Sequence, residues 1–419
     1  MTIFKKVFKD SDFYTNVLTL LKGSVVAQLI PLLVSPVLTR MYTPTEFGVL
    51  ALFTSFSTIL GSVVNGRYEQ ALVLVKSEKE AKDITVLSLI ISLVMSILLM
   101  LFLLIVDSYL FDYLESTDLN YWVYFIPLIV LGIGVYNTLN YYELRRKNFK
   151  FISNSDIYRS FSFASVQLLF PIFKKGVFGL IVGKIISTLL SALYLWRKSK
   201  ISLSSMEISN LIILAKRYKD FPIYTNASIL LNNLSVNAIN ILIPFFYSTS
   251  MLGFYALMNK VLSVPFVFIG NSIQQVFLED AVRQKQKKSN AYQLTKRMVL
   301  QLGTLSFLGF GGAFFIIEDG FAFIFGEDWR ISGLYAKCLL PFFMFKFIAS
   351  PLTIIHTAFE KQKLSFVLQL IMFVLSLFAI VFAYYNSLAF ESYLVLFSCL
   401  MSLFYIYRII VILRIAKNQ

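Results

Sequence analysis

The sequence ITVLSLIISLVMSILLMLFLLIV, which runs from Ile84 to Val106, is the clearest indication of the fold class. It contains no charged residue, and about 20 apolar residues in succession suffice for a helix to cross the hydrocarbon core of a bilayer. Similar apolar stretches recur along the whole chain and are separated by short charged clusters. The sequence therefore predicts an all-α integral membrane protein that crosses the membrane many times.

The amino-acid composition supports the same class. Apolar residues make up 58% and charged residues 15% of the 419 residues, whereas soluble proteins contain about 25% charged residues. A soluble enzyme, a nucleic-acid-binding protein or a disordered chain would need a more polar sequence, despite the formal charge of +15. Two cysteines inside apolar stretches and a single histidine give no metal-ligand spacing, so we expect no metal and no cofactor.

The apolar stretches predict twelve transmembrane helices, because each is long enough to cross the bilayer and no loop is long enough to form a domain. The predicted ranges are 15–38, 46–66, 84–106, 121–142, 157–173, 177–196, 222–243, 253–271, 298–317, 333–356, 364–385 and 391–413.

The chain is predicted to consist of two halves with six helices each. Residues 1–200 form the N-terminal lobe, 201–220 an amphipathic cytoplasmic linker and 221–419 the C-terminal lobe. The linker segment MEISNLIILAKR (206–217) is typical of an amphipathic helix on the inner leaflet, although a solvated linker is the alternative. The motifs GVLAL (48–52) and GFYAL (253–257), at the starts of spans two and eight, are a faint sign of internal duplication.

The distribution of Lys and Arg predicts the orientation. Most of the 38 basic residues fall in the alternate loops that share a side with the N-terminus. Because basic loops stay in the cytoplasm, both termini are predicted to be cytoplasmic. The net charge then reflects topology rather than a nucleic-acid partner. The opposite loops hold only Arg40, Lys174, Lys175, Arg330 and Lys337.

Charged residues within spans are the first candidates for function, because each costs about 2.5–3.5 kcal/mol at a helix centre. The candidates are nearly all cations, which favours an anionic substrate. Glu69, two residues from Arg67, is the candidate coupling residue, with an inner-surface ion pair as the alternative. Residues near span ends can instead extend to the inner interface. The candidate cations are Lys22, Arg67, Lys184, Lys260 and Lys346.

Span seven is unusually rich in asparagine. At 100° per residue, Asn226, Asn233, Asn237 and Asn240 share one face, whereas Asn232 lies off it. Such a face must contact protein or water within a membrane. Hydrogen bonds to neighbouring helices and a hydrophilic cavity that binds sugar hydroxyls are both compatible with this pattern.

The search for catalytic residues finds none. The sequence contains no Gly-x-Ser-x-Gly, no Walker loop and no His-Glu pairing, and His356 is expected to be a packed or interfacial residue rather than a base. We therefore expect a transport protein rather than an enzyme.

Six motifs together resemble those of a known family. Each is moderately specific, but they occur in the expected order over most of the chain, and the sequence resembles the Wzx-like O-antigen and polysaccharide flippases. That family belongs to the multidrug/oligosaccharidyl-lipid/polysaccharide exporter superfamily. The motifs are RMYTPTEFGVLAL (40–52), GRYEQALVL (66–74), FP (221–222), FYSTSMLGFYAL (246–257), QVF (275–277) and FGEDW (325–329).

The resemblance implies a substrate and a mechanism. Such proteins move an undecaprenyl-diphosphate-linked oligosaccharide from the inner to the outer leaflet of the bacterial inner membrane, for O-antigen, capsule or related polysaccharide synthesis. Two six-helix lobes around a central cavity alternate their access. Cations would then bind the diphosphate and amides the sugar. Membrane lipids, a glycan polymerase and a chain-length regulator are further candidate partners.

Two alternatives belong to different classes. A cation-coupled multidrug antiporter of the same superfamily would usually carry an acidic residue deep in a lobe, and no Asp or Glu lies in the middle of a predicted span. A membrane glycan polymerase would have a long outer loop with paired charged residues, and the outer loops predicted here are short.

Overall fold

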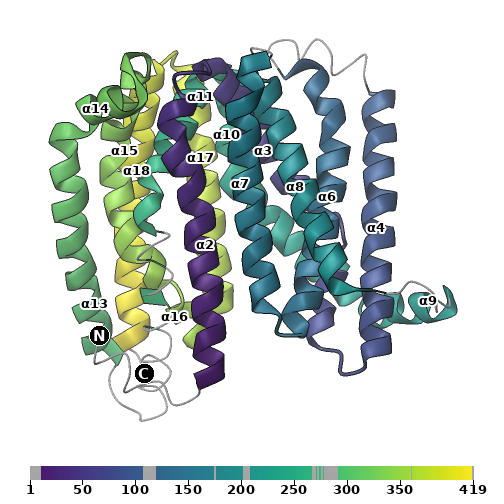
Figure 1. Ribbon diagram of the computed structural model, residues 1–419. Coiled ribbons are helices and arrows are strands. Elements are labelled where there is room, and N and C mark those ends of the chain that lie inside the picture. Colours follow the sequence, from purple (N-terminus) through teal and green to yellow (C-terminus); the bar gives the residue numbers. More distant parts are fainter. Residues whose placement is uncertain are drawn as a thin grey trace. The chain divides into compact units, whose positions relative to one another are not determined.

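The computed structural model describes residues 11–106, 119–173, 176–201, 208–266, 270, 273–274, 277, 291–359 and 361–417. Its elements in these ranges are helices, and none of the described residues forms a strand (Figure 1). This confirms the all-α class.

Eight of the described helices are long and apolar enough to cross a membrane. The most apolar is Glu78–Ile105, with a mean hydropathy of 2.9 over its most apolar 18 residues, and it contains most of the stretch Ile84 to Val106. The chain is therefore a multi-pass membrane protein. The other seven are Tyr121–Arg145, Phe178–Ser199, Phe221–Phe246, Ala291–Phe325, Glu327–Leu352, Lys363–Tyr385 and Phe390–Lys417.

Four predicted spans overlap helices that are shorter or more polar. They correspond to α2 (Ser11–Leu38), α3 (Pro44–Gly61), α7 (Phe149–Phe173) and α11 (Thr249–Leu262). Helix α11 has only 14 residues, and the end of its predicted span, near 271, lies partly outside the described residues. The number twelve and the cytoplasmic position of both termini stay predictions.

The contacts between helices divide the chain into two compact units. Unit 1 comprises residues 1–42 and 49–237, and unit 2 comprises residues 43–48 and 238–419. Two helices pass from one unit into the other. The first turn of α3 belongs to unit 2, and α10 (Asn226–Phe246) changes unit after Asn237.

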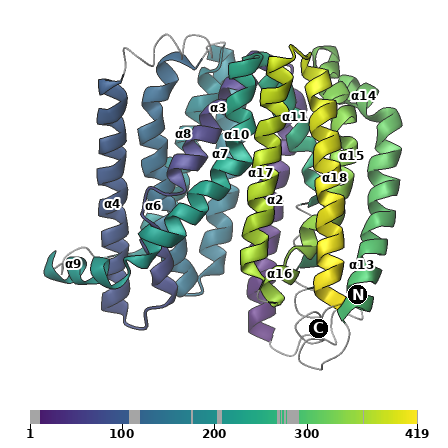
Figure 2. The same cartoon turned by 180° about the vertical axis from the view of Figure 1, so that it is seen from behind.

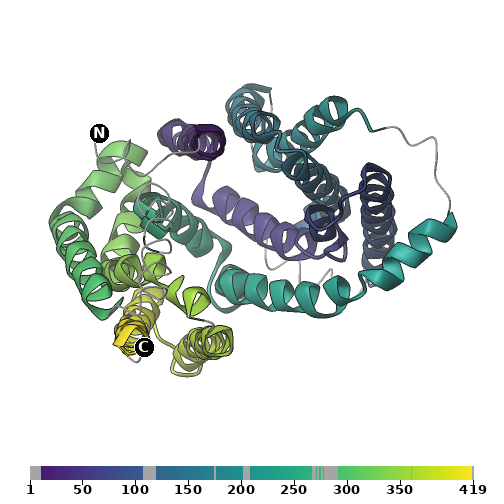
Figure 3. The ribbon, with the colours of Figure 1, turned by 90° about the horizontal axis from the view of Figure 1, so that it is seen from below.

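Unit 1 is a bundle in which α8 (Phe178–Ser199) packs against α6 (Ile126–Arg145) and α7, while α2 packs on α7 and α4 (Glu78–Ile105) on α6. Figure 3 shows these helices along their axes. Small residues allow the close approach that helix pairs in membranes need. A Cβ added to Gly23 of α2 would lie only 1.9 Å from Oγ of Ser153 on α7.

Helix α4 presents its small polar residues to the protein and its large apolar residues outward. Ser88, Ser92 and Ser96 are buried, whereas Leu98 and Phe102 are more than half exposed. A water-soluble helix would show the reverse. In a bilayer, lipid tails are as apolar as leucine, so large apolar side chains face outward and small residues pack between helices.

The predicted amphipathic linker contains α9 (Ile208–Arg217), while residues 202–207 lie outside the described residues. Figure 2 shows α9 lying across α4 near one end of that helix. Leu211 and Leu214 pack into a cluster with residues of α4, whereas Ile212 is exposed. Nη1 of Arg217 lies 2.7 Å from Oε1 of Glu80 on α4. An amphipathic helix is present, and its position on the inner leaflet stays a prediction.

Unit 2 is built around α15 (Arg330–Leu352), which packs against α11, α13 (Ala291–Ser306), α14 (Gly312–Phe325) and α18 (Phe390–Lys417). Helix α17 (Gln362–Tyr385) and the short α16 (Ile355–Ala358) pack on α18. A π-helical turn, Phe307–Gly311, joins α13 to α14, and a second one, Phe221–Thr225, precedes α10. Such turns are rare and often occur at functional sites.

The remaining short elements are 3-10 turns next to longer helices. They are η1 (Tyr68–Val73), η2 (Asn120–Phe125) and η6 (Glu327–Trp329).

The glycines that open the two similar motifs, Gly48 and Gly253, lie at one helix crossing within unit 2. A Cβ on Gly48 would lie 1.9 Å from the carbonyl oxygen of Thr249, and one on Gly253 would lie 1.8 Å from the carbonyl oxygen of Pro44. The buried Trp329 packs beside this crossing. Its ring centroid lies 4.9 Å from that of Phe47 and 5.6 Å from that of Phe254. Three of the six family motifs therefore meet at one helix crossing.

Candidate functional site

Lys346 of α15 lies among three phenylalanine rings. Its Nζ is 5.4 Å from the ring centroid of Phe266 and 5.2 Å from those of Phe342 and Phe343. A cation over an aromatic face gains about 0.5–2 kcal/mol. Lys346 forms no ion pair with a carboxylate of the described residues. The three rings, called the aromatic cage below, therefore hold a cation that has no anionic protein partner there.

The other predicted cations are distributed over both units. Lys184 lies in α8 of unit 1, with its Nζ 5.6 Å from the ring centroid of Phe163 on α7. Lys260 lies half-buried in the last turn of α11 in unit 2. Lys22 lies in α2, but its side chain is outside the described residues. Unit 2 therefore holds Lys260 and Lys346, and unit 1 holds Arg67 and Lys184.

Arg67 and Glu69 lie in the segment that connects α3 with α4, and their side chains form an ion pair with each other. Arg67 has a left-handed backbone with φ of 60°, and its Nη1 lies 3.5 Å from Oε1 of Glu69. The Glu69 side chain is only 1% exposed, and its Oε2 has no hydrogen-bond partner among the described residues. Burial raises the pKa of Glu69, while a backbone hydrogen bond and Arg67 act in the opposite direction. This carboxylate is therefore able to take up a proton closer to neutral pH than an exposed glutamate.

The asparagine face of α10 agrees with the predicted arrangement. Asn226, Asn233, Asn237 and Asn240 are half-buried, whereas Asn232 is exposed. Nδ2 of Asn233 donates to the carbonyl of Ile229 at 3.1 Å, and Nδ2 of Asn237 donates to the carbonyl of Asn233 at 2.9 Å. These two side chains therefore donate within α10 itself rather than to a neighbouring helix.

A polar network that the sequence analysis did not identify connects α6 with α7. Oδ1 of Asp156 accepts hydrogen bonds from the Tyr136 hydroxyl at 2.6 Å and from Nη2 of Arg159 at 2.7 Å. Nδ2 of Asn140 donates to the Tyr136 hydroxyl at 3.2 Å. The predicted fifth span began at 157, whereas α7 begins at Phe149, so Asp156 lies within a helix. The i, i+3 spacing of Asp156 and Arg159 in the sequence could have indicated this ion pair, because residues three apart are neighbours on a helix.

A second feature that was missed lies where α16 meets α18 in unit 2. Arg408 lies within the predicted span 391–413 but was not among the candidate cations, and it is only 9% exposed within α18. His356 is buried and packed, as predicted, with Nδ1 2.8 Å from the carbonyl oxygen of Thr353. Nε of Arg408 and Nε2 of His356 have no hydrogen-bond partner among the described residues. Arg408 is therefore a further candidate cation of unit 2.

The helical arrangement is similar to that of solved transporters. A structure of the lipid II flippase MurJ in an inward closed conformation has a TM-score of 0.66 and 14% identity, covering 96% of this chain and 86% of that one. An inward-facing multidrug resistance MATE family transporter of the MOP superfamily has a TM-score of 0.64 and 12% identity, covering 96% of both chains. The MATE transporter ClbM has a TM-score of 0.56 and 14% identity, covering 98% and 96%. At such identities the likeness shows the fold alone, and the fold of this chain is similar to that of these solved structures.

The sequence itself defines the family. Residues 37–333 match the family described as Polysaccharide biosynthesis protein, and this range includes all six motifs. The chain belongs to that family. The resemblance to Wzx-like flippases is thereby confirmed, since family and fold agree with it. No curated protein gives a significant sequence match.

Proposed function

We propose that this protein is a flippase for undecaprenyl-diphosphate-linked oligosaccharide repeat units. It moves them from the inner to the outer leaflet of the bacterial inner membrane for O-antigen, capsule or related polysaccharide synthesis. The family match over residues 37–333 carries the proposal. A lipid II flippase among the structural neighbours supports a lipid substrate. Alternating access of two six-helix lobes around a central cavity is part of the proposal.

The cations of unit 2 suit a diphosphate head group. Hydrogen bonds from cations to phosphate oxygens are about twice as strong as neutral ones, and a diphosphate leaving water needs several donors. Lys346 has three aromatic neighbours and no carboxylate partner among the described residues, so its charge is available for an anion. Lys260 and the buried Arg408 belong to the same unit.

The asparagine face of α10 suits the sugar part of the substrate. Amide side chains both donate and accept hydrogen bonds, which matches the hydroxyl groups of an oligosaccharide. Asn233 and Asn237 use a donor within their own helix, and each amide oxygen provides an acceptor. The face is half-buried rather than fully packed.

Glu69 is the proposed coupling residue, because burial raises the pKa of this carboxylate and its Oε2 has no hydrogen-bond partner among the described residues. A fixed ion pair is the alternative role. Each charge that crosses the membrane potential contributes about 2.3 kcal/mol per 100 mV. An inside-negative potential would therefore help to return an empty cationic site to the inner side.

A multidrug antiporter is the second candidate, because MATE transporters share the fold and Asp156 lies within α7. The structure gives a reason to prefer the flippase. Asp156 already accepts hydrogen bonds from Arg159 and Tyr136, so its charge is balanced by a neighbour rather than available to a cationic drug.

Deletion of the gene in its own host distinguishes the two candidates. We expect surface polysaccharide to be lost and undecaprenyl-linked repeat units to accumulate inside, with both effects reversed by a plasmid copy. Immunoblots of surface glycan and mass spectrometry of lipid extracts measure them. Unchanged surface glycan together with increased sensitivity to cationic drugs would contradict the proposal and support the antiporter.

A further inference from the structure

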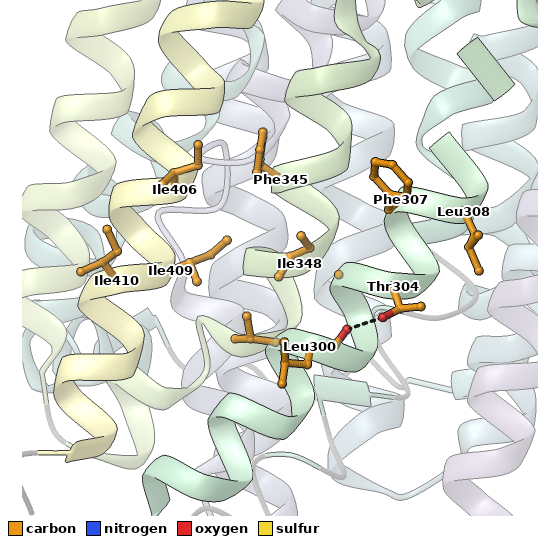
Figure 4. Close-up of a pocket in the computed structure, with 11 residues that line it drawn as sticks. Leu300, Thr304, Phe307, Leu308, Phe345, Ile348, Ile406, Ile409 and Ile410 are labelled. Carbon is orange, nitrogen blue, oxygen red and sulfur yellow. Dashed lines mark hydrogen bonds between the residues drawn. The ribbon is translucent and has the colours of Figure 1, made fainter. Parts of the chain in front are cut away.

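An apolar groove lies between α13, α15 and α18 in unit 2. Its volume is about 550 Å³, and Figure 4 shows its eleven lining residues. Leu300, Phe307 and Leu308 form an exposed rim, and the buried Ile348 lies deeper. Helices α13, α15 and α18 belong to candidate membrane spans, so the rim faces hydrocarbon rather than water in the membrane.

The lining favours a hydrocarbon occupant. The only polar side chain in it is Thr304, whose hydroxyl donates to the carbonyl of Leu300 at 3.0 Å within the same helix (Figure 4). No side chain of the lining is therefore left to recognise a sugar or a phosphate. Apolar cavities of this kind do not retain water and instead bind apolar molecules.

Gly303 keeps the groove open. A Cβ added there would have a single neighbour within 4 Å, namely Cδ1 of Ile348 at 3.9 Å. Gly48 and Gly253 differ, since a Cβ on either would collide with a backbone carbonyl. Gly303 therefore leaves a space empty rather than allowing two helices to touch.

The π-helical turn Phe307–Gly311 connects the groove with the aromatic cage of Lys346. Phe307 lines the groove, whereas the buried Phe310 packs on the other side of the turn. The Phe310 ring centroid lies 6.4 Å from that of Phe266 and 5.8 Å from that of Phe347. Phe266 in turn faces the Lys346 ammonium. The π-helical turn and α15 therefore connect the apolar groove with Lys346, a cation that has no carboxylate partner among the described residues.

We propose that this groove binds the polyprenyl chain of the substrate while the cations of unit 2 hold its diphosphate. This inference rests on the proposed function and adds a binding site for the lipid tail. The juxtaposition matches an amphiphile with an anionic head and a long hydrocarbon chain. We assign the groove to the polyprenyl chain rather than to another hydrocarbon. The reason is that Lys346, which lies close to the groove, is proposed to bind the diphosphate head group of the same lipid.

The test fills the groove with a side chain. Purified protein is photolabelled with undecaprenyl diphosphate that carries a diazirine in its chain. We expect Gly303→Leu to reduce labelling about tenfold, equivalent to about 1.4 kcal/mol of binding. The matched control is Gly320→Leu on α14, which also has open space around its Cβ but does not line the groove, and should label like the wild type. Ile410→Trp narrows the exposed rim from α18 and should act like Gly303→Leu.

Two results would overturn the inference. One is equal labelling of the wild type and of both groove variants when all three show the same thermal stability. The other is competition by phosphatidylglycerol as effective as that by unlabelled undecaprenyl diphosphate, which would assign the groove to bulk lipid. If labelling depends on Gly303 while gene deletion leaves the surface glycan unchanged, the groove stands and the flippase proposal fails.

Discussion

Gly253→Leu is expected to deplete the folded protein and to abolish export of surface glycan. A Cβ at this position would lie 1.8 Å from the carbonyl oxygen of Pro44, where the first turn of α3 crosses α11. A backbone carbonyl cannot move aside as the end of a flexible side chain can, so α3 and α11 must separate. Their separation must also change the ring contacts of Trp329 with Phe47 and Phe254. Overpacking typically costs about 1–3 kcal/mol and occasionally more, and a collision with backbone places this substitution at the upper end of that range.

The amount of protein in membranes and its melting temperature in detergent measure this effect. Gly253→Ala should be less severe, because it adds the colliding Cβ but none of the further side-chain atoms of leucine. Gly320→Leu is the control and should leave both quantities unchanged. Wild-type abundance and melting temperature for Gly253→Leu would show that the two helices do not cross as described.

Replacement of Lys346 by methionine should remove transport and leave the protein folded. The ammonium lies among the rings of Phe266, Phe342 and Phe343, so an apolar side chain of similar length suits the same surroundings. A charge-assisted hydrogen bond contributes about 1.5–3 kcal/mol, which corresponds to a loss of roughly 10- to 100-fold in diphosphate affinity. Lys346→Arg keeps the charge and should retain much of the activity.

The measurement combines export of surface glycan with melting temperature at matched expression. Lys346→Met is expected to melt at or above the wild-type temperature, because a half-buried charge no longer has to leave water. A structural role would instead lower the melting temperature and the export together. Full export from the double variant Lys260→Met and Lys346→Met would remove both lysines from the mechanism.

The helices were predictable because their signal is long and strong. The predicted seventh span, 222–243, corresponds to the π-turn and α10 at Phe221–Phe246, and the predicted twelfth, 391–413, corresponds to α18 at Phe390–Lys417. Apolar length alone determines such segments in a bilayer. The common face of the asparagines followed from helical periodicity alone, which α10 maintains after its initial π-turn.

Features that depend on tertiary packing were not predictable. Arg408 lies near the end of the predicted span 391–413, where a long side chain can extend to the interface, yet α18 buries it beside Tyr405. The predicted fifth span omitted the first two turns of α7, because these turns contain polar residues such as Asp156. Within the fold, Asp156 forms an ion pair with Arg159, so both charges are tolerated in the helix. Nothing in the sequence distinguishes Gly303, which leaves a groove open, from Gly253, which allows a helix crossing.

Movement of the lipid substrate across a bilayer can be measured with the protein reconstituted in liposomes. Purified protein is placed in liposomes that carry a fluorescent undecaprenyl-diphosphate oligosaccharide in the inner leaflet, and a membrane-impermeant quencher is added outside. We expect fluorescence to decay faster with wild-type protein than in protein-free liposomes, and Lys346→Met to remove most of this difference. Equal decay with and without the wild-type protein, at confirmed incorporation and folding, would contradict the proposed function.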